Sequence, residues 1–206
     1  MSNGNMAASE LAAVEIHGMD RGAFVMKSAL AVGTVYGVAA VGPFVGKALA
    51  ASGDVGILNF ALTLEYLEAD FYTQGMKLNL GGEVAKFAKL AGAHEQQHVD
   101  ALIATVKKLG GTPAKKPTFK FPISNQATFL KLAQTLEDTG VGAYNGAAPA
   151  IKSPEVLAAA GSIVQIEARH AAVIRLLNGV SPAPGAFDEA LMEAKVLAAV
   201  KPLIKA

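Results

Sequence analysis

The sequence of 206 residues contains no cysteine, and only 17% of its residues are charged. Without cysteine the chain forms no disulfide, no thiolate zinc site and no iron–sulfur cluster, and it has no cysteine nucleophile. The net charge is only +1, and basic residues are not interleaved with aromatic ones, so the sequence carries no signature of nucleic-acid binding. Hydrophobic residues make up 52% of the chain, which excludes a disordered protein. Any metal must therefore be held by carboxylates and imidazoles.

The first 50 residues are predicted to be an N-terminal tail followed by an export signal or membrane anchor, separate from the helical bundle of residues 51–206. A polar tail leads to a basic segment, 21–27, which precedes an uncharged run, 28–46, and a small-x-small sequence ending at Ala50. That order is typical of an export signal. Because a helix of about 19 residues approaches the thickness of a bilayer core, a retained membrane anchor is one alternative and a buried core helix is another. The sequence predicts an exported protein of the periplasm or cell envelope, either cleaved or anchored by residues 28–46.

Residues 51–206 are predicted to be all-α, because apolar residues recur at helical spacing and no stretch alternates as a β-strand does. The predicted helix caps are Asp54, Ser124 and Ser153. A segment rich in proline, lysine and threonine, 110–123, separates the second helix from the third. The prediction is a four-helix bundle made of two helix pairs joined by one long crossover. The expected helices cover about 55–75, 83–109, 124–146 and 154–177, with a short fifth at about 188–200 across one end of the bundle.

The most informative pattern is a stretch that occurs twice, 72 residues apart. The first copy holds Glu65, Tyr72, Glu95 and His98. The second copy holds, in the same register, Glu137, Tyr144, Glu167 and His170. Agreement at all four positions without a gap is not expected by chance. The repeat predicts one site to which both helix pairs contribute.

Each copy ends in a Glu-x-x-His motif, whose two side chains project from one face of a helix because residues three apart lie about 60° apart around the axis. Carboxylates and imidazoles together suit iron or manganese better than calcium or structural zinc. Four buried glutamates would carry four negative charges, which two divalent cations would neutralise. We therefore expect two iron ions, or manganese or a mixed pair in their place. The six predicted ligands are Glu65, Glu95, His98, Glu137, Glu167 and His170.

Glu68 competes with Glu65 for the role of the ligand on the first helix. The offset of 72 leads from Glu65 to Glu137, but from Glu68 to Gly140, which favours Glu65. The sequence leaves three alternatives open for Glu68: an extra ligand, a residue that supports the ligands, or a residue exposed to solvent.

The two tyrosines and one histidine are the other residues of interest near the motif. Tyr72 and Tyr144 lie two turns beyond Glu65 and Glu137 on the same helix faces. They either hydrogen-bond the ligands, carry an electron, or fill the core with a satisfied hydroxyl. His94 points about 100° away from its neighbour on the helix, and we expect it on the surface or behind the ligands.

Three segments resemble helices of the ferritin-like family that includes plant desiccation-related proteins and exported bacterial members. Residues 58–72, 93–102 and 163–170 are similar to its first, second and fourth helices, and the likeness extends over roughly residues 54–206. The resemblance implies a ferritin-like bundle with a di-iron site at the six predicted ligands.

Two functions from different classes follow from these expectations. The leading one is a metal-dependent redox protein whose ions react with oxygen or peroxide, as in a ferroxidase or a peroxide scavenger. The alternative is a membrane-anchored structural subunit, which docks to a membrane or a partner through residues 28–46 and leaves the metal site idle. Self-association is left open.

Overall fold

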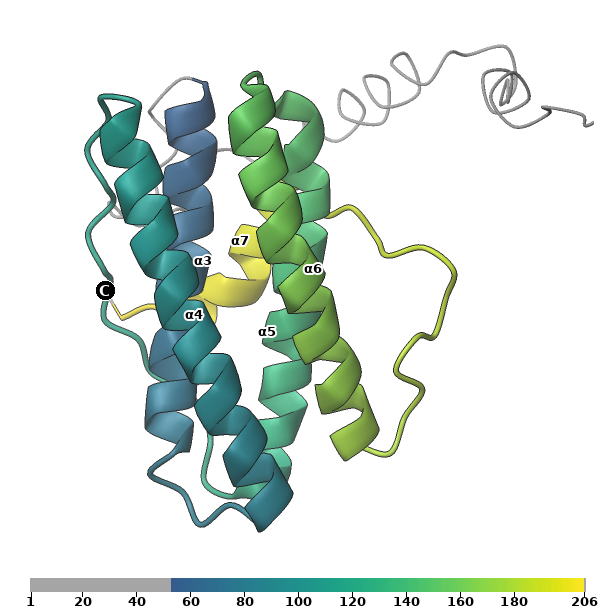
Figure 1. Cartoon of the computed structure of the whole chain (residues 1–206). Helices are drawn as coiled ribbons and strands as arrows, with labels where there is room; N and C mark the ends of the chain where they lie inside the picture. Colours follow the sequence, from purple (N-terminus) through teal and green to yellow (C-terminus); the bar gives the residue numbers. More distant parts are fainter. Residues whose placement is uncertain (1–52, 206) are drawn as a thin grey trace, which may run out of the picture. The chain divides into compact units, whose positions relative to one another are not determined.

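The computed structural model describes residues 53–205, which form four long helices and one short helix (Figure 1). The long helices are α3 (Asp54–Gly75), α4 (Gly82–Lys108), α5 (Gln126–Ala147) and α6 (Pro154–Leu177). The short helix is α7 (Glu193–Val200), and single 3-10 turns follow α5 and α7 at η3 (Ala148–Ala150) and η4 (Lys201–Leu203). The predicted all-α bundle is confirmed.

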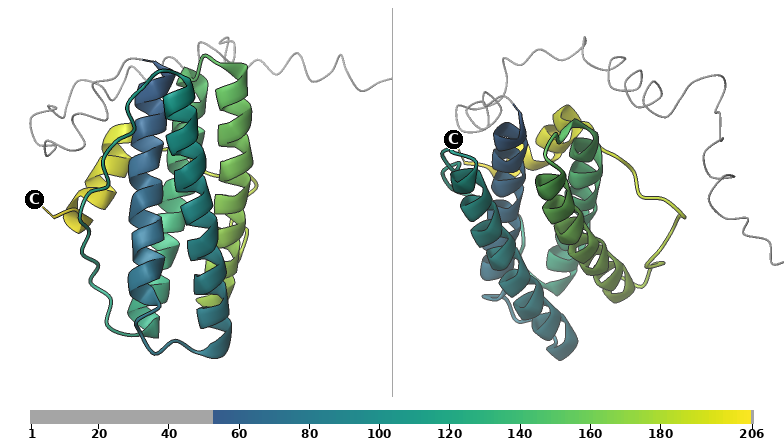
Figure 2. Two further views of the ribbon diagram at one scale, coloured as in Figure 1. Left: turned by 60° about the vertical axis from the view of Figure 1, so that its left-hand side comes forward. Right: turned by 45° about the horizontal axis from the view of Figure 1, so that its top comes forward.

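The long helices form two side-by-side pairs, α3 with α4 and α5 with α6 (Figures 1 and 2). The crossover, residues 109–125, runs along the whole length of the bundle before α5 begins. As a result α5 runs antiparallel to α3, and the middle of each long helix lies at the same level. This arrangement is the one that the repeat requires, because it brings the two copies of the motif face to face.

The predicted helix starts are partly wrong. Asn125, not Ser124, caps α5: its side chain accepts a hydrogen bond from the backbone N of Thr128 in a capping box. Ser153 does cap α6, as predicted. Asp54 does not cap its own helix. Its carboxylate accepts hydrogen bonds of 2.8 Å from the backbone N atoms of residues 152 and 153, and so joins the start of α3 to the start of α6.

The short fifth helix begins at Glu193 rather than at about residue 188, and it crosses the side of the bundle rather than an end (Figure 2). Its position is set by a backbone hydrogen bond between the segment just before it and α5. The backbone N of Leu191 donates to the carbonyl of Gly142 at 2.8 Å. The C-terminal segment then pairs with the crossover, since the backbone N of Lys205 donates to the carbonyl of Thr118 at 2.9 Å.

The apolar core is divided into two clusters, whose members on α4 and α6 lie toward opposite ends of these helices. Leu58, Val106 and Val156 belong to the cluster nearest the start of α3, and Phe71 and Phe129 belong to the other. Phe71 and Phe129 stack with ring centroids 4.9 Å apart. The clusters leave a polar layer at the middle of the bundle, screened from water on both sides.

The predicted export or anchor segment, 28–46, lies outside the described residues, so its role and the domain boundary at residue 50 stay predictions. Among residues 53–205, no helix combines the length and the apolar character that a membrane span needs.

Gly146 is a point of close approach that tests how α7 is positioned. A Cβ at this residue would lie 1.9 Å from the carbonyl oxygen of Leu191. We expect Gly146→Ala to lower the free energy of unfolding by about 1–3 kcal/mol, because backbone must move to relieve the overlap. The matched control is Gly161→Ala in α6, whose Cβ would meet nothing within 4 Å and which should stabilise the helix by about 0.5–1 kcal/mol. Urea unfolding of both variants makes the comparison, and equal effects would contradict the described packing.

Candidate metal centre

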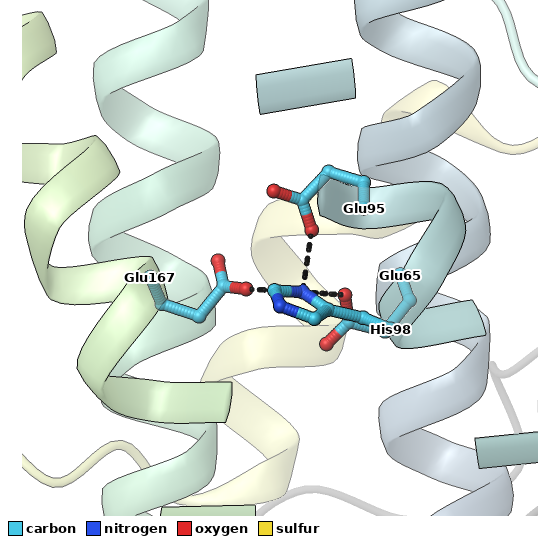
Figure 3. Close-up of side chains that lie close together, drawn as sticks. All are labelled: Glu65, Glu95, His98 and Glu167. Atoms are coloured by element: carbon cyan, nitrogen blue, oxygen red, sulfur yellow. Dashed lines mark hydrogen bonds and ion pairs between the residues drawn. The ribbon is translucent and has the colours of Figure 1, made fainter. Parts of the chain in front are cut away.

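The six predicted ligands all project into the polar layer at the middle of the bundle. The four glutamate side chains are essentially inaccessible to solvent, and the imidazole of His170 is only 3% exposed. The His98 side chain is 11% exposed, which makes it the most accessible of the six. Figure 3 shows Glu65, Glu95, His98 and Glu167 converging from α3, α4 and α6.

The six side chains form two overlapping groups, and within each group one ligand atom per residue lies within 4.8 Å of the others. The first group is Glu65, Glu95, His98 and Glu167. The second group is Glu95, Glu137, Glu167 and His170. The offset of 72 residues converts one group into the other, so the groups are related by an internal two-fold. Glu95 and Glu167 belong to both groups, so they would be the carboxylates that two bound ions share.

The contacts of His98 show why a cation fits this layer better than protons do. Its Nδ1 atom lies 3.2 Å from Glu65 Oε2, 3.1 Å from Glu95 Oε2 and 3.0 Å from Glu167 Oε1. A single N–H donates well to only one of these oxygens. Accordingly, both oxygens of Glu167 are buried and receive no hydrogen bond from any described residue, although Oε1 lies close to His98 Nδ1. Buried acceptors without donors are a natural place for a metal ion.

His170 repeats this arrangement in the second group. Its Nδ1 atom lies 2.9 Å from Glu95 Oε1 and 3.5 Å from Glu137 Oε2. Both histidines therefore turn the same ring nitrogen toward the carboxylates, as ligands on one helix face should.

Comparison with known proteins agrees with this geometry. Residues 53–180, more than half of the chain, match the ferritin-like domain. The chain belongs to the ferritin-like domain family. The protein rds1 of Schizosaccharomyces pombe (strain 972 / ATCC 24843) is 24% identical over 157 residues, which are 73% of this chain and 39% of rds1. The chain thus spans about two fifths of that relative's length.

A solved structure shows the same fold. The crystal structure of a conserved hypothetical protein, rv2844, from Mycobacterium tuberculosis superposes with a TM-score of 0.58. The two chains are 20% identical, and the match covers 69% of this chain and 99% of the other. The resemblance drawn from the sequence is therefore confirmed at the level of family and fold.

In this ferritin-like domain, Tyr72 and Tyr144 each hydrogen-bond a glutamate of the opposite copy. The Tyr72 hydroxyl on α3 donates to Glu137 Oε1 on α5, and the Tyr144 hydroxyl on α5 donates to Glu65 Oε1 on α3. Both rings are buried. These paired bonds fix the rotamers of the two unshared glutamates, while an electron-carrying role for either tyrosine stays a prediction.

His94 supports a ligand from behind. Its Nδ1 lies 3.0 Å from Nε2 of His170, and the two rings stack with centroids 5.2 Å apart. This contact occupies Nε2 of His170 and leaves Nδ1 to face the carboxylates, an arrangement typical of metal-binding histidines. The residue 72 positions after His94 is Ile166, so the repeat gave no signal for this contact and the first group has no equivalent.

Glu68 is also buried, with 3% of its surface exposed, although it belongs to neither group. The sequence left open whether this side chain faced solvent, and the structure excludes that option. Its carboxylate lies over Gly140, the residue to which the repeat assigns it.

The two histidines are strongly basic in this environment. Burial lowers the pKa of the His98 imidazole, but its contacts with three carboxylates outweigh burial and raise that pKa to about 12. Burial also lowers the pKa of His170, but contacts with Glu137 and Glu95 outweigh burial and raise that pKa to about 9. Without metal both rings are therefore charged at neutral pH, and each ion that binds must displace protons.

The glutamates divide into ionised and protonated ones. Burial raises the pKa of Glu95, but contacts with both histidines reverse the effect and lower it to about 2. Burial raises the pKa of Glu65 to about 8 and that of Glu167 well above its usual range. The metal-free layer thus limits its charge by keeping protons on some carboxyls.

These shifts predict how the stability of the metal-free protein depends on pH. The folded-state pKa of Glu65 is about 8, above the ordinary value of 4.5. Its contribution to the free energy of unfolding is therefore complete below about pH 4.5 and is lost as the pH rises through about 8. His170, raised from 6.5 to about 9, loses its contribution in the same direction. We expect the free energy of unfolding of chelator-treated protein to fall between about pH 5 and pH 9.

Urea unfolding at a series of pH values measures this slope. Glu65→Gln should make it shallower, since an amide does not titrate. Glu83→Gln, at an exposed carboxylate, is the control and should leave it unchanged. A slope that is the same in Glu65→Gln as in the wild type would contradict the assignment.

Proposed function

We propose that this protein binds two transition-metal ions, iron foremost, and uses them in redox chemistry with dioxygen or peroxide. The observation that carries the proposal is the pair of four-residue groups that share Glu95 and Glu167. Two ions held by shared carboxylates would lie close enough to act on one small molecule. Ferroxidase activity or removal of peroxide is the class of reaction that this arrangement supports.

The donor set favours iron or manganese over other cations. Four carboxylates and two neutral imidazoles carry four negative charges, and two divalent ions cancel them in a layer that water does not reach. Calcium prefers oxygen alone, and structural zinc prefers four ligands in a closed tetrahedron. When bound, iron ions at such a site supply one-electron steps to oxygen or peroxide.

The chain's own residues hold the ligands in place and manage protons. Tyr72 and Tyr144 orient the two unshared glutamates, and His94 fixes the ring of His170. The apolar clusters above and below exclude bulk water from the ligands. Protons held on Nδ1 of both histidines leave when the ions enter, so affinity should increase with pH.

Location in the cell envelope goes with this proposal as a prediction from residues 21–50. The alternative of an anchored docking subunit depends on residues 28–46, and among residues 53–205 no observation favours it. A mature N-terminus just after Ala50, found by mass spectrometry, would support export with cleavage.

Metal analysis of protein purified without chelator tests the proposal directly. We expect about two ions per chain in protein loaded anaerobically with ferrous iron, and fewer than about one in the double variant Glu95→Ala with His170→Ala, which loses a ligand from both groups. Mixing loaded protein with oxygen or hydrogen peroxide should consume the oxidant and oxidise the iron.

The matched control is Glu83→Ala, which replaces an exposed glutamate at the start of α4, the helix that carries Glu95. This variant should bind iron like the wild type. A wild-type iron content below about one per chain that is unchanged in the double variant would refute the proposal.

A further inference from the structure

Glu68 is a buried carboxylate for which the six-ligand site gives no role. Its side chain is 3% exposed and comes from the middle of α3, one turn from Glu65. Within residues 53–205 it takes part in no hydrogen bond or ion pair, and no lysine, arginine or histidine reaches it. A carboxyl group buried without a partner costs several kcal/mol in general, so the bundle would be expected to lack it if it served only packing.

The space for this side chain is made by a glycine on the facing helix. A Cβ at Gly140 would lie 3.1 Å from Glu68 Oε1 and 3.4 Å from Glu167 Oε2. The absence of a side chain at 140 therefore lets the Glu68 carboxylate lie beside Glu167, one of the two shared carboxylates. Glu68 and Gly140 are equivalent positions in the repeat, so the difference between them breaks the internal two-fold symmetry locally.

Electrostatics place Glu68 in the same unit as the ligands. Burial raises its pKa well above the ordinary range, and the next causes are the charges of Glu167 and Glu137. The other two ligand glutamates act on it in the same direction. Glu68 is thus near all four carboxylates, and it is affected more by the second copy of the motif than by its own.

We propose that Glu68 is a seventh protein ligand of the metal centre, which makes the two ion positions unequal. This inference rests on the proposed function, because it assigns a further residue to that site. In the structure described here the carboxylate is not among the atoms within 4.8 Å of one another, so ligation requires its side chain to rotate. Rotation breaks no hydrogen bond, and Gly140 has no side chain to compensate on the opposite helix. One ion position therefore gains a carboxylate ligand that the position related to it by the internal two-fold lacks.

Anaerobic titration with Co²⁺ tests the proposal, because its visible absorption reports the number of ligands. We expect the wild type to bind two ions in unequal steps. Glu68→Gln should weaken one step by about tenfold or more and leave the other unchanged. The same variant should change the intensity of the visible bands, since a lost ligand changes the geometry around that ion.

Glu68→Asp separates ligation from charge. Aspartate keeps the negative charge but is one methylene shorter, so it should weaken the same step as glutamine does. Retained affinity in Glu68→Asp would show that only the charge matters and would overturn ligation. The matched control is Asp70→Asn, an acid-to-amide change on the same helix at a residue that pairs with Lys116 away from the centre. It should leave both steps unchanged.

Two further outcomes keep the inference distinct from the proposed function. If the wild type binds two ions and Glu68→Gln gives the same two affinities and the same spectrum, this inference fails and the proposed function stands. If the wild type binds no cobalt, iron or manganese, both fail. Circular dichroism and thermal unfolding of the metal-free variants check folding, and Glu68→Gln should be at least as stable as the wild type, because a neutral amide is less costly to bury than a carboxylate.

Discussion

The burial of four carboxylates at the centre of an apolar bundle is the constraint on which the rest of this structure depends. Such a layer is stable only if positive charge reaches it, and the two Glu-x-x-His histidines supply that charge from α4 and α6. The apolar clusters on either side strengthen every interaction in the layer by excluding water. The long crossover sets the level at which the two helix pairs face one another. Together with the lengths of the helices, it brings these six side chains into one layer of the bundle.

The internal two-fold is nearly complete among the ligands and is broken just outside them. The six predicted ligands and the tyrosines at 72 and 144 have counterparts 72 residues away, but His94 corresponds to Ile166 and Glu68 corresponds to Gly140. Both departures lie close to the second group, which contains His170 and Glu137. A duplicated framework therefore surrounds the two groups with different environments.

The sequence was sufficient for the helices, which follow from short-range spacing. The same spacing, together with the offset of 72, picked six side chains that the structure brings together, and their role as ligands stays a prediction. The sequence was insufficient where a distant segment decides the outcome. Asp54 has the chemistry of a cap, yet the backbone of residues 152 and 153 takes its carboxylate. The start of α7 depends on where Leu191 meets α5, and the burial of Glu68 depends on a glycine on another helix. Neither contact leaves a periodic signal in the sequence.

The distribution of ligands between the helix pairs has a mechanical consequence. The first group takes three residues from the α3–α4 pair and one from α6, and the second takes three residues from the α5–α6 pair and one from α4. Neither helical hairpin holds a complete group by itself. An ion bound in either position would therefore cross-link two hairpins that are otherwise joined by the crossover and by packing. Separating the hairpins would break up both groups.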